Sequence, residues 1–272
     1  MVYLLATFAN DAEYLPSLLH ALASQLDAPE AEREQETWGV GYFADDRALI
    51  IKKPASILNH RTMYALAPEV RSRILLACAK AGTDRELAPP YRFRRWLFAY
   101  AGDLSALQQI RATVAEKLPD FIRSEIRENT PGGLAFGMFL AELHRAGRLE
   151  DPLAQGPDLG AALARAADTI TRLSGEVESG PCRASFVASN GRVVLVSEAG
   201  ATLSQKVQMG LERLPDGPPD PALTDFKQQA AALKRFRAVV IAPGDLSDRP
   251  DWEVIPSGST RVIDGALKVS AL

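Results

Sequence analysis

The stretch MVYLLATF, residues 1–8, decides how the rest of the chain is interpreted. Its residues are almost all apolar, and a run of this kind predicts a strand buried on both faces. Chain termini usually fray unless something holds them, so a buried first strand either completes the core or brings the N-terminus to a site of chemistry. The side chain at position 2 separates these two interpretations, and it is Val2.

The bulk composition indicates ordinary globular material. The 272 residues are 47% hydrophobic and 24% charged, which is enough apolar mass for a sizeable core, and the formal net charge is −3. This charge disfavours a nucleic-acid partner, because phosphate binding needs clustered Lys and Arg. No apolar run approaches the roughly 20 residues of a membrane span, and the start lacks the charged region of a secretory signal. We therefore expect a cytoplasmic protein with no membrane or nucleic-acid partner.

The cysteines and histidines do not form the pattern of a disulfide framework or a metal site. Cys78 and Cys182 lie far apart without a CxxC pattern, and we expect reduced thiols in the core. The histidines, His20, His60 and His144, lie in separate segments without metal-ligand spacing. We expect no metal and no cofactor.

Hydrophobic periodicity predicts strands near both ends of the chain, with helices between them. The predicted strands cover residues 1–8, 38–43, 48–52, 73–79, 96–100, 184–188, 193–196, 238–242, 252–256, 261–264 and 267–269. Predicted helices cover residues 10–25, a stretch from Pro54 to Val70, and residues 105–117, 134–145 and 159–177, with loops at 27–36 and 215–221. Asn190-Gly191 is a strong hairpin-turn signal. This order favours one α+β domain spanning residues 1–272, in which the tail strands join sheets begun by the N-terminus.

Short motifs follow one another along the chain: MVYLL (1–5), TWGVGYF (37–43), DDR (45–47), KP (53–54), LLACAKAGT (75–83), LAPPY (87–91), WLFAYAGDL (96–104) and WEVIPSGS (252–259). In this order they resemble the class II, or N-terminal nucleophile, glutamine amidotransferases. The corresponding family patterns are M-C-R-L-L, G-W-G-x-G-[YW], D-G-R, K-P, L-[IV]-A-H-V-R-x-A-T, N-T-H-P-F, W-x-F-A-H-N-G-[DN]-L and W-x-x-[VI]-P-x-G-S. The chain looks most similar to the short stand-alone branch that includes the ergothioneine-pathway amidohydrolases. The resemblance implies the N-terminal nucleophile hydrolase fold, a four-layer αββα sandwich.

The reaction of that family depends on a few groups. The thiol of residue 2 attacks the side-chain amide of glutamine, and its own α-amino group serves as the base. An Asn side chain and the backbone N–H of the following Gly stabilise the oxyanion. An Arg binds the substrate α-carboxylate in a two-pronged fork, and an Asp in a T-D-S-E-like segment binds the α-ammonium.

Most of these groups are replaced at the matching positions of this chain. Val2 stands at the nucleophile, and a branched hydrocarbon has neither a lone pair nor an acidic proton. Ala101 stands at the oxyanion Asn, which leaves only the Gly102 N–H. Lys80 stands at the Arg and keeps the charge but loses the fork, while Pro131 or a neighbour stands at the Asp. Loss of one oxyanion donor typically costs about 10²–10³ in rate, and loss of the nucleophile costs on the order of 10⁶.

The positions that build turns, hairpins and core are retained: Trp38, Gly39, Gly41, Pro90, Trp96, Phe98, Gly102 and Trp252. The resemblance therefore predicts a catalytically inactive relative, a pseudoenzyme that acts as a binding, scaffold or regulatory protein. We expect an unidentified protein partner, a small ligand in the vestigial pocket, or both. The expected pocket residues are Val2, Trp38, Lys80, Ala101, Gly102 and Pro131.

Two other functions stay open at this point. One is an active amidohydrolase on a glutamine or γ-glutamyl-type substrate, which uses Cys78 or a metal-free water mechanism. The other is a structural subunit that supports an active paralogue in a hetero-oligomer. Thr7 is expected to be structural because its hydroxyl lies several residues from any free amine. The cluster of Arg92, Arg94 and Arg95 is either a docking patch for an acidic partner or a solvated strand face.

Overall fold

The computed structural model describes residues 2–23, 26, 36–54, 70–81, 88–126, 130–177, 180–212 and 226–272. Three sequence predictions lie wholly or almost wholly outside these residues: the helix that begins at Pro54, most of the loop at 27–36, and the loop at 215–221. His60 also lies outside them.

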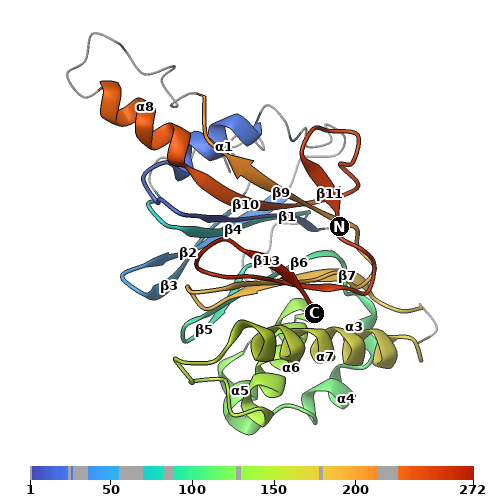
Figure 1. Ribbon diagram of the computed structural model, residues 1–272. Coiled ribbons are helices and arrows are strands. Elements are labelled where there is room, and N and C mark those ends of the chain that lie inside the picture. Colours follow the sequence, from blue (N-terminus) through green and yellow to red (C-terminus); the bar gives the residue numbers. More distant parts are fainter. Residues whose placement is uncertain are drawn as a thin grey trace.

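The described residues form an antiparallel mixed α/β fold (Figure 1). The strands are β1 (Val2–Ala9), β2 (Glu36–Ala44), β3 (Arg47–Pro54), β4 (Ile74–Ala81), β5 (Tyr91–Phe93), β6 (Trp96–Asp103), β7 (Arg183–Ser189), β8 (Val194–Ser197), β9 (Leu203–Met209), β10 (Arg237–Pro243), β11 (Trp252–Val254), β12 (Thr260–Ile263) and β13 (Val269–Ala271). The helices are α1 (Leu15–Ala23), α3 (Ala106–Gln109), α4 (Arg111–Ala115), α5 (Asp120–Glu125), α6 (Pro131–Arg145), α7 (Gly156–Ser174) and α8 (Phe226–Arg235).

Strand β1 lies at the centre of this arrangement, as the apolar run at residues 1–8 predicts. It pairs with β10 on one side and with β4 on the other. One group of strands therefore runs in the order β11-β9-β10-β1-β4-β2-β3. The second group runs in the order β5-β6-β7-β8-β12-β13. The pair Val2–Gly102, between β1 and β6, joins the two groups.

Successive residues of β1 face opposite sides of its sheet, and each side is buried. Leu4 and Phe8 belong to the hydrophobic cluster that includes the second group of strands, whereas Leu5 belongs to a cluster with α1 and Leu233 of α8. Figure 1 shows α1 and α8 beyond the outer face of the first group, and α6 and α7 beyond the outer face of the second. The burial on both faces explains why β1 reads as a continuous apolar run rather than an alternating one.

Helix α6 covers the second group and begins earlier than the sequence predicts. Thr130 caps it, because its Oγ1 accepts a hydrogen bond of 2.8 Å from the backbone N–H of Gly133, and Pro131 occupies the first turn. Phe136 stacks on Phe98 of β6, with ring centroids 5.1 Å apart. The predicted helix at 134–145 is therefore confirmed and extended to residue 131 by its cap.

Other predictions differ from the structure in detail. The single helix expected at 105–117 is wrong: α3 and α4 are separated at Ile110, whose backbone (φ −106°, ψ 21°) leaves the helical region. The sequence also missed α5, α8, β5 and β9. Strand β9 reads LSQKVQM and lacks the apolar run of a core strand. The hairpin of β7 and β8 around Asn190-Gly191 is confirmed, and the strand expected at 267–269 lies instead at Val269–Ala271.

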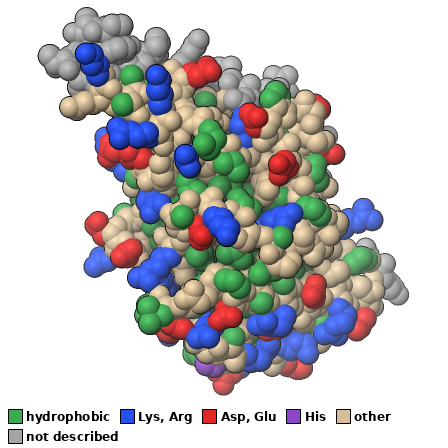
Figure 2. Space-filling model, in the orientation of Figure 1, with side chains coloured by type: hydrophobic (Ala, Val, Ile, Leu, Met, Phe, Trp, Pro, Cys, Tyr) green, Lys and Arg blue, Asp and Glu red, His purple; other side chains and the backbone are tan. Residues whose placement is uncertain are grey.

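Charged side chains of both signs are scattered over the visible face of the molecule, among hydrophobic and other side chains (Figure 2). Lys and Arg stand beside Asp and Glu over the strands and over the helices at the bottom of that view. Among the helices of the described residues, none is both long and apolar enough to cross a membrane.

Candidate functional site

Val2 lies at the junction of the two groups of strands. It faces Lys80 of β4 and Gly102 of β6 in register, and its side chain is buried. The backbone thus brings three of the predicted site residues to adjacent positions. The side chain at the centre of this junction is a hydrocarbon, which offers no nucleophile.

Gly102 is required by the backbone at this junction. Its φ is +98°, a conformation that side chains with a Cβ rarely adopt, and a Cβ placed there would lie 2.1 Å from the carbonyl oxygen of Arg183. Its neighbour Ala101 is buried within the cluster that contains Val2. The strand therefore keeps the tight approach of β6 to β7, while the position before the glycine carries only a methyl group.

Lys80 and Cys78 lie on one face of β4, two residues apart. Lys80 is partly exposed, and within the described part of the chain no carboxylate pairs with it. Cys78 is fully buried, and this burial raises the pKa of its thiol well above the ordinary value, against a smaller opposite effect of the Lys52 charge. A buried thiol of raised pKa is a poor nucleophile, which weighs against the alternative of Cys78 catalysis.

The other two predicted pocket residues are Trp38 and Pro131. Trp38 belongs to the cluster on the helix α1 side of the sheet, whereas Val2 belongs to the cluster on the opposite side. Its indole N–H is buried and has no hydrogen-bond partner among the described residues. Pro131 opens α6, where the neighbouring Gly132 packs against the ring of Tyr91. The structure thus brings together Val2, Lys80, Ala101 and Gly102, but it places Trp38 on the other face.

Two tyrosines near this region, the partly buried Tyr91 and the buried Tyr100, were not identified as site residues by the sequence analysis. Burial raises the pKa of Tyr91 to about 12, although a side-chain hydrogen bond with Thr130 lowers it. Burial also raises the pKa of Tyr100, and the nearby Tyr91 and Cys78 add to the effect. The Nζ of Lys52 lies 5.1 Å from the centre of the Tyr91 ring. Tyr100 could have been named as a candidate site residue from the sequence, because it stands at the position of a His in the family pattern.

The remaining candidate residues from the sequence analysis are Thr7, the histidines and the arginines at positions 92, 94 and 95. Thr7 is buried in β1, in the middle of the sheet. His20 is exposed on α1, and no group of three metal-ligating side chains occurs in the described residues. Arg94 and Arg95 lie in the turn between β5 and β6, so the interpretation as a strand face is wrong for them. Arg92 is on β5 and donates a hydrogen bond to the carbonyl of Ala48.

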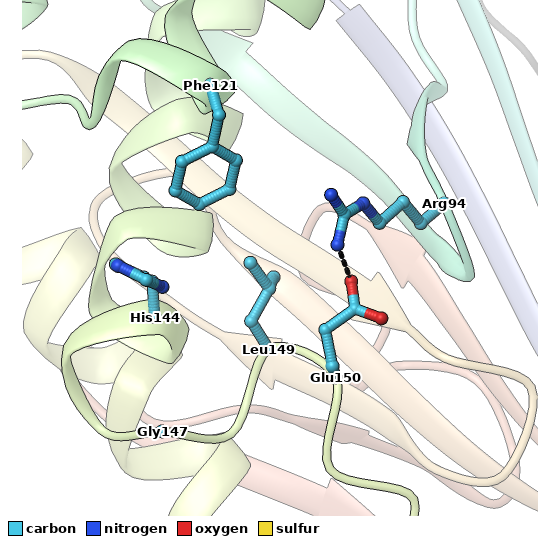
Figure 3. A pocket seen from close by; sticks show the side chains of 6 residues that line it. All are labelled: Arg94, Phe121, His144, Gly147, Leu149 and Glu150. Atoms are coloured by element: carbon cyan, nitrogen blue, oxygen red, sulfur yellow. Dashed lines mark hydrogen bonds and ion pairs between the residues drawn. The ribbon is translucent and has the colours of Figure 1, made fainter.

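A surface hollow of about 410 Å³ lies at the C-terminal end of α6 (Figure 3). Its lining residues are Arg94, Phe121, His144, Gly147, Leu149 and Glu150. Arg94 forms an ion pair with Glu150, and His144 meets the Phe121 ring edge-on at 5.0 Å between centroids. Apart from the basic run at residues 92–95, no sequence pattern indicated this hollow, because its residues come from separate segments.

The fold resembles that of several solved proteins. One is a glutamine aminotransferase class-II domain protein from Silicibacter pomeroyi. The match covers 99% of this chain and 98% of the Silicibacter chain, with a TM-score of 0.61 and 16% sequence identity. Another is a predicted glutamine amidotransferase from Pseudomonas aeruginosa. The match covers 100% of this chain and 96% of the Pseudomonas chain, with a TM-score of 0.57 and 15% sequence identity. The chain has the fold of these proteins.

A third similar structure is part of a larger protein. It is glutamine phosphoribosylpyrophosphate amidotransferase from Bacillus subtilis, complexed with ADP and GMP. The match covers 99% of this chain but only 48% of the Bacillus chain, with a TM-score of 0.54 and 10% sequence identity. No protein-family model and no curated protein matches the sequence. At these identities the likeness concerns the fold, and the chemistry must be argued from the side chains.

Proposed function

We propose that this chain is a class II glutamine amidotransferase-like protein that has lost glutaminase activity and acts by binding. The observation that carries the proposal is the register pair of Val2 and Gly102. The resemblance implies that nucleophile and oxyanion N–H meet at this pair. Here the backbone of the pair is present, and the reacting group is absent.

The neighbouring side chains support the same conclusion. Ala101 carries no amide to stabilise an oxyanion, and Lys80 replaces a two-pronged guanidinium by a single ammonium. No described thiol takes over, because Cys78 is fully buried. The combined loss of nucleophile and oxyanion donor leaves the scaffold without its reaction.

We further propose that the two groups of strands and their covering helices form the four-layer αββα sandwich of N-terminal nucleophile hydrolases. In this proposal, residues 1–272 make one domain, similar to the short stand-alone branch of the family. The arrangement of α1 and α8 on one side and of α6 and α7 on the other supports it.

The retained activity in this proposal is recognition in the cytoplasm, either of a protein partner or of a small ligand. Lys80 supports the second possibility. It is a partly exposed ammonium beside Val2, and the described residues provide no carboxylate partner for it. A ligand carboxylate would satisfy it. Compounds of the amino acid and γ-glutamyl classes are therefore the first to screen by thermal shift, with Lys80→Met as the variant expected to lose any stabilisation.

The test of lost catalysis is ammonia release from glutamine by the purified protein. We expect a rate equal to that of buffer, and also equal to that of the Lys80→Met and Cys78→Ala variants. A working class II glutaminase serves as the positive control. Hydrolysis above the buffer rate that disappears in either variant would show an active amidohydrolase instead.

A further inference from the structure

The hollow at the C-terminal end of α6 is separate from the junction of β1 and β6 and has the dimensions of a small-molecule site. Its volume of about 410 Å³ falls within the range of roughly 300–1,000 Å³ that is usual for ligand pockets. Segments far apart in sequence supply its lining: the β5–β6 turn, α5, the last turn of α6 and the loop that follows.

One part of the lining is apolar and aromatic. Phe121 of α5 and Leu149 of the loop stand next to each other in Figure 3, with the imidazole of His144 beside the Phe121 ring. Leu149 is buried and Phe121 is partly exposed. An aromatic face attracts cations through its negative π surface.

The chain already uses this aromatic surface to hold a cation. The Cζ of Arg94 lies 5.1 Å from the centre of the Phe93 ring and 6.0 Å from that of Phe121. Arg94 is also paired with Glu150, whose Oε1 accepts the hydrogen bond. The other oxygen of this carboxylate, Oε2, has no hydrogen-bond partner among the described residues.

The charges around the hollow favour a second cation over an anion. The C-terminal end of α6, which carries the negative end of the helix dipole, lies at the hollow. Glu150 and the more distant Glu125 both act on Arg94, and they raise its pKa. Among the lining residues that the structure describes, Glu150 is the carboxylate that faces the Arg94 guanidinium, and His144 is the remaining titratable group.

The other arginines near the end of α6 pair with carboxylates outside the lining of the hollow. Arg145 pairs with Glu142. Arg148 pairs with Asp151 and with Asp158. These pairs leave Glu150 as the carboxylate of the lining that a bound cation would meet.

We propose that this hollow binds a small organic cation with an aromatic body, such as an aromatic amine or guanidine. The cationic group contacts Glu150 beside Arg94, and the ring lies against Leu149 and Phe121. An aromatic carboxylate of the same shape is disfavoured, because it would face the Glu150 carboxylate and the negative end of a helix. This site does not depend on the function proposed for the junction at Val2.

The test compares two probes with the same aromatic body and opposite charge, phenethylamine and 3-phenylpropanoate. Binding is measured by NMR titration of the full chain at low ionic strength and pH 7.5, with the imidazole signals of His144 as the local reporter. We expect phenethylamine to bind with chemical-shift changes at His144, and 3-phenylpropanoate to bind at least about tenfold more weakly.

Three substitutions and a control separate binding from folding. Glu150→Gln and Phe121→Ala each lower the affinity for phenethylamine about three- to tenfold. Arg94→Gln raises the affinity, because it removes the cation that competes for the Glu150 carboxylate. A variant that merely unfolds cannot produce this gain. Glu176→Gln, an exposed carboxylate beyond the end of α7, leaves the affinity unchanged.

Several outcomes would overturn the proposal. They are absence of binding by both probes, tighter binding of 3-phenylpropanoate, or phenethylamine affinity that is the same in the wild type and in the folded Glu150→Gln and Arg94→Gln variants. Thermal melts of each variant establish that it is folded.

Discussion

Val2 of β1 lies opposite Gly102 of β6, and this pair joins the two groups of strands. This contact is a pairing of the β1 and β6 backbones, and it does not require a particular side chain at position 2. A valine fits this pairing as well as a cysteine does, since both are small and apolar enough to be buried. The pairing of β1 with β6 therefore places no requirement on the chemistry of the side chain at position 2.

The conformation of Gly102 gives the first prediction. Gly102→Ala should destabilise the protein by about 2–4 kcal/mol, because the new Cβ adds a steric clash to the strain of a positive φ. That Cβ would lie 2.1 Å from the carbonyl oxygen of Arg183. Urea denaturation followed by circular dichroism measures the change.

The control for this prediction is Gly147→Ala. Gly147 also has a positive φ, +67°, but no atom lies within 4 Å of the added Cβ. Gly147→Ala should therefore lower the free energy of unfolding only through the strained backbone conformation, by about 1 kcal/mol. Equal losses in the two variants would mean that the approach of β6 to β7 is looser than described.

The burial of Cys78 gives the second prediction. Iodoacetamide at pH 8 should leave Cys78 unmodified in the native protein, because the thiol is fully buried and its pKa is raised. In urea the same thiol should react at the rate of a free cysteine. Mass spectrometry of tryptic peptides distinguishes Cys78 from Cys182, and the Cys78→Ala variant verifies the assignment. Rapid labelling of Cys78 in the native protein would show that its thiol is reactive, and catalysis by Cys78 would again be a candidate function.

How much of this could be read from the sequence depends on whether the signal was local. The apolar run of β1 and the Asn190-Gly191 turn are local patterns, and both predictions are confirmed. The resemblance identified the positions Val2, Lys80 and Gly102, which lie adjacent in the sheet. Such adjacency arises from pairing between distant strands, and only an ordered set of motifs can predict it.

The features that were missed have non-local causes. Trp38 was assigned to the pocket, but the face on which it lies follows from strand alternation relative to neighbours that the sequence does not specify. The hollow near α6 joins Arg94, Phe121 and Glu150 from three segments with no shared motif. Tyr91 gains its raised pKa from burial against α6, which is a tertiary effect.

The third prediction concerns alkaline pH. Cys78 has an ordinary pKa of 9.0 and a raised value in the folded state, so the unfolded chain loses this proton first. The folded state then binds more protons than the unfolded state, and stability falls as the pH rises. The contribution is complete below pH 9 and is lost progressively above it. Tyr91, with its pKa raised from 10.0 to about 12, adds to the fall above pH 10.

The measurement is the free energy of unfolding in urea from pH 8 to pH 10.5. Cys78→Ala should show a smaller decline over the lower part of this range than the wild type, whatever its stability at pH 8. The same decline in both proteins would mean that the thiol ionises in the folded state, and the interpretation of Cys78 as an inert core residue would fail.

The fourth prediction concerns Glu142, a nearly buried carboxylate between the two long helices. Its Oε2 accepts a 3.0 Å hydrogen bond from Nε of Arg165 on α7, and its Oε1 pairs with Arg145 on α6. Glu142→Ala leaves both guanidinium groups without this partner and opens a small void between the helices. We expect a loss of about 1–3 kcal/mol. Urea denaturation gives this value.

Two comparisons make the origin of that loss clear. Glu176→Ala removes an exposed carboxylate and should change stability by less than about 0.5 kcal/mol. Arg165→Ala should lose less than Glu142→Ala, because the Arg165 side chain is 51% exposed and regains water on losing its partner, whereas the Glu142 side chain is 9% exposed. A double variant that lost the full sum of both single losses would show that the two side chains are not coupled. In that case apolar packing, not the ion pair, would hold α6 against α7.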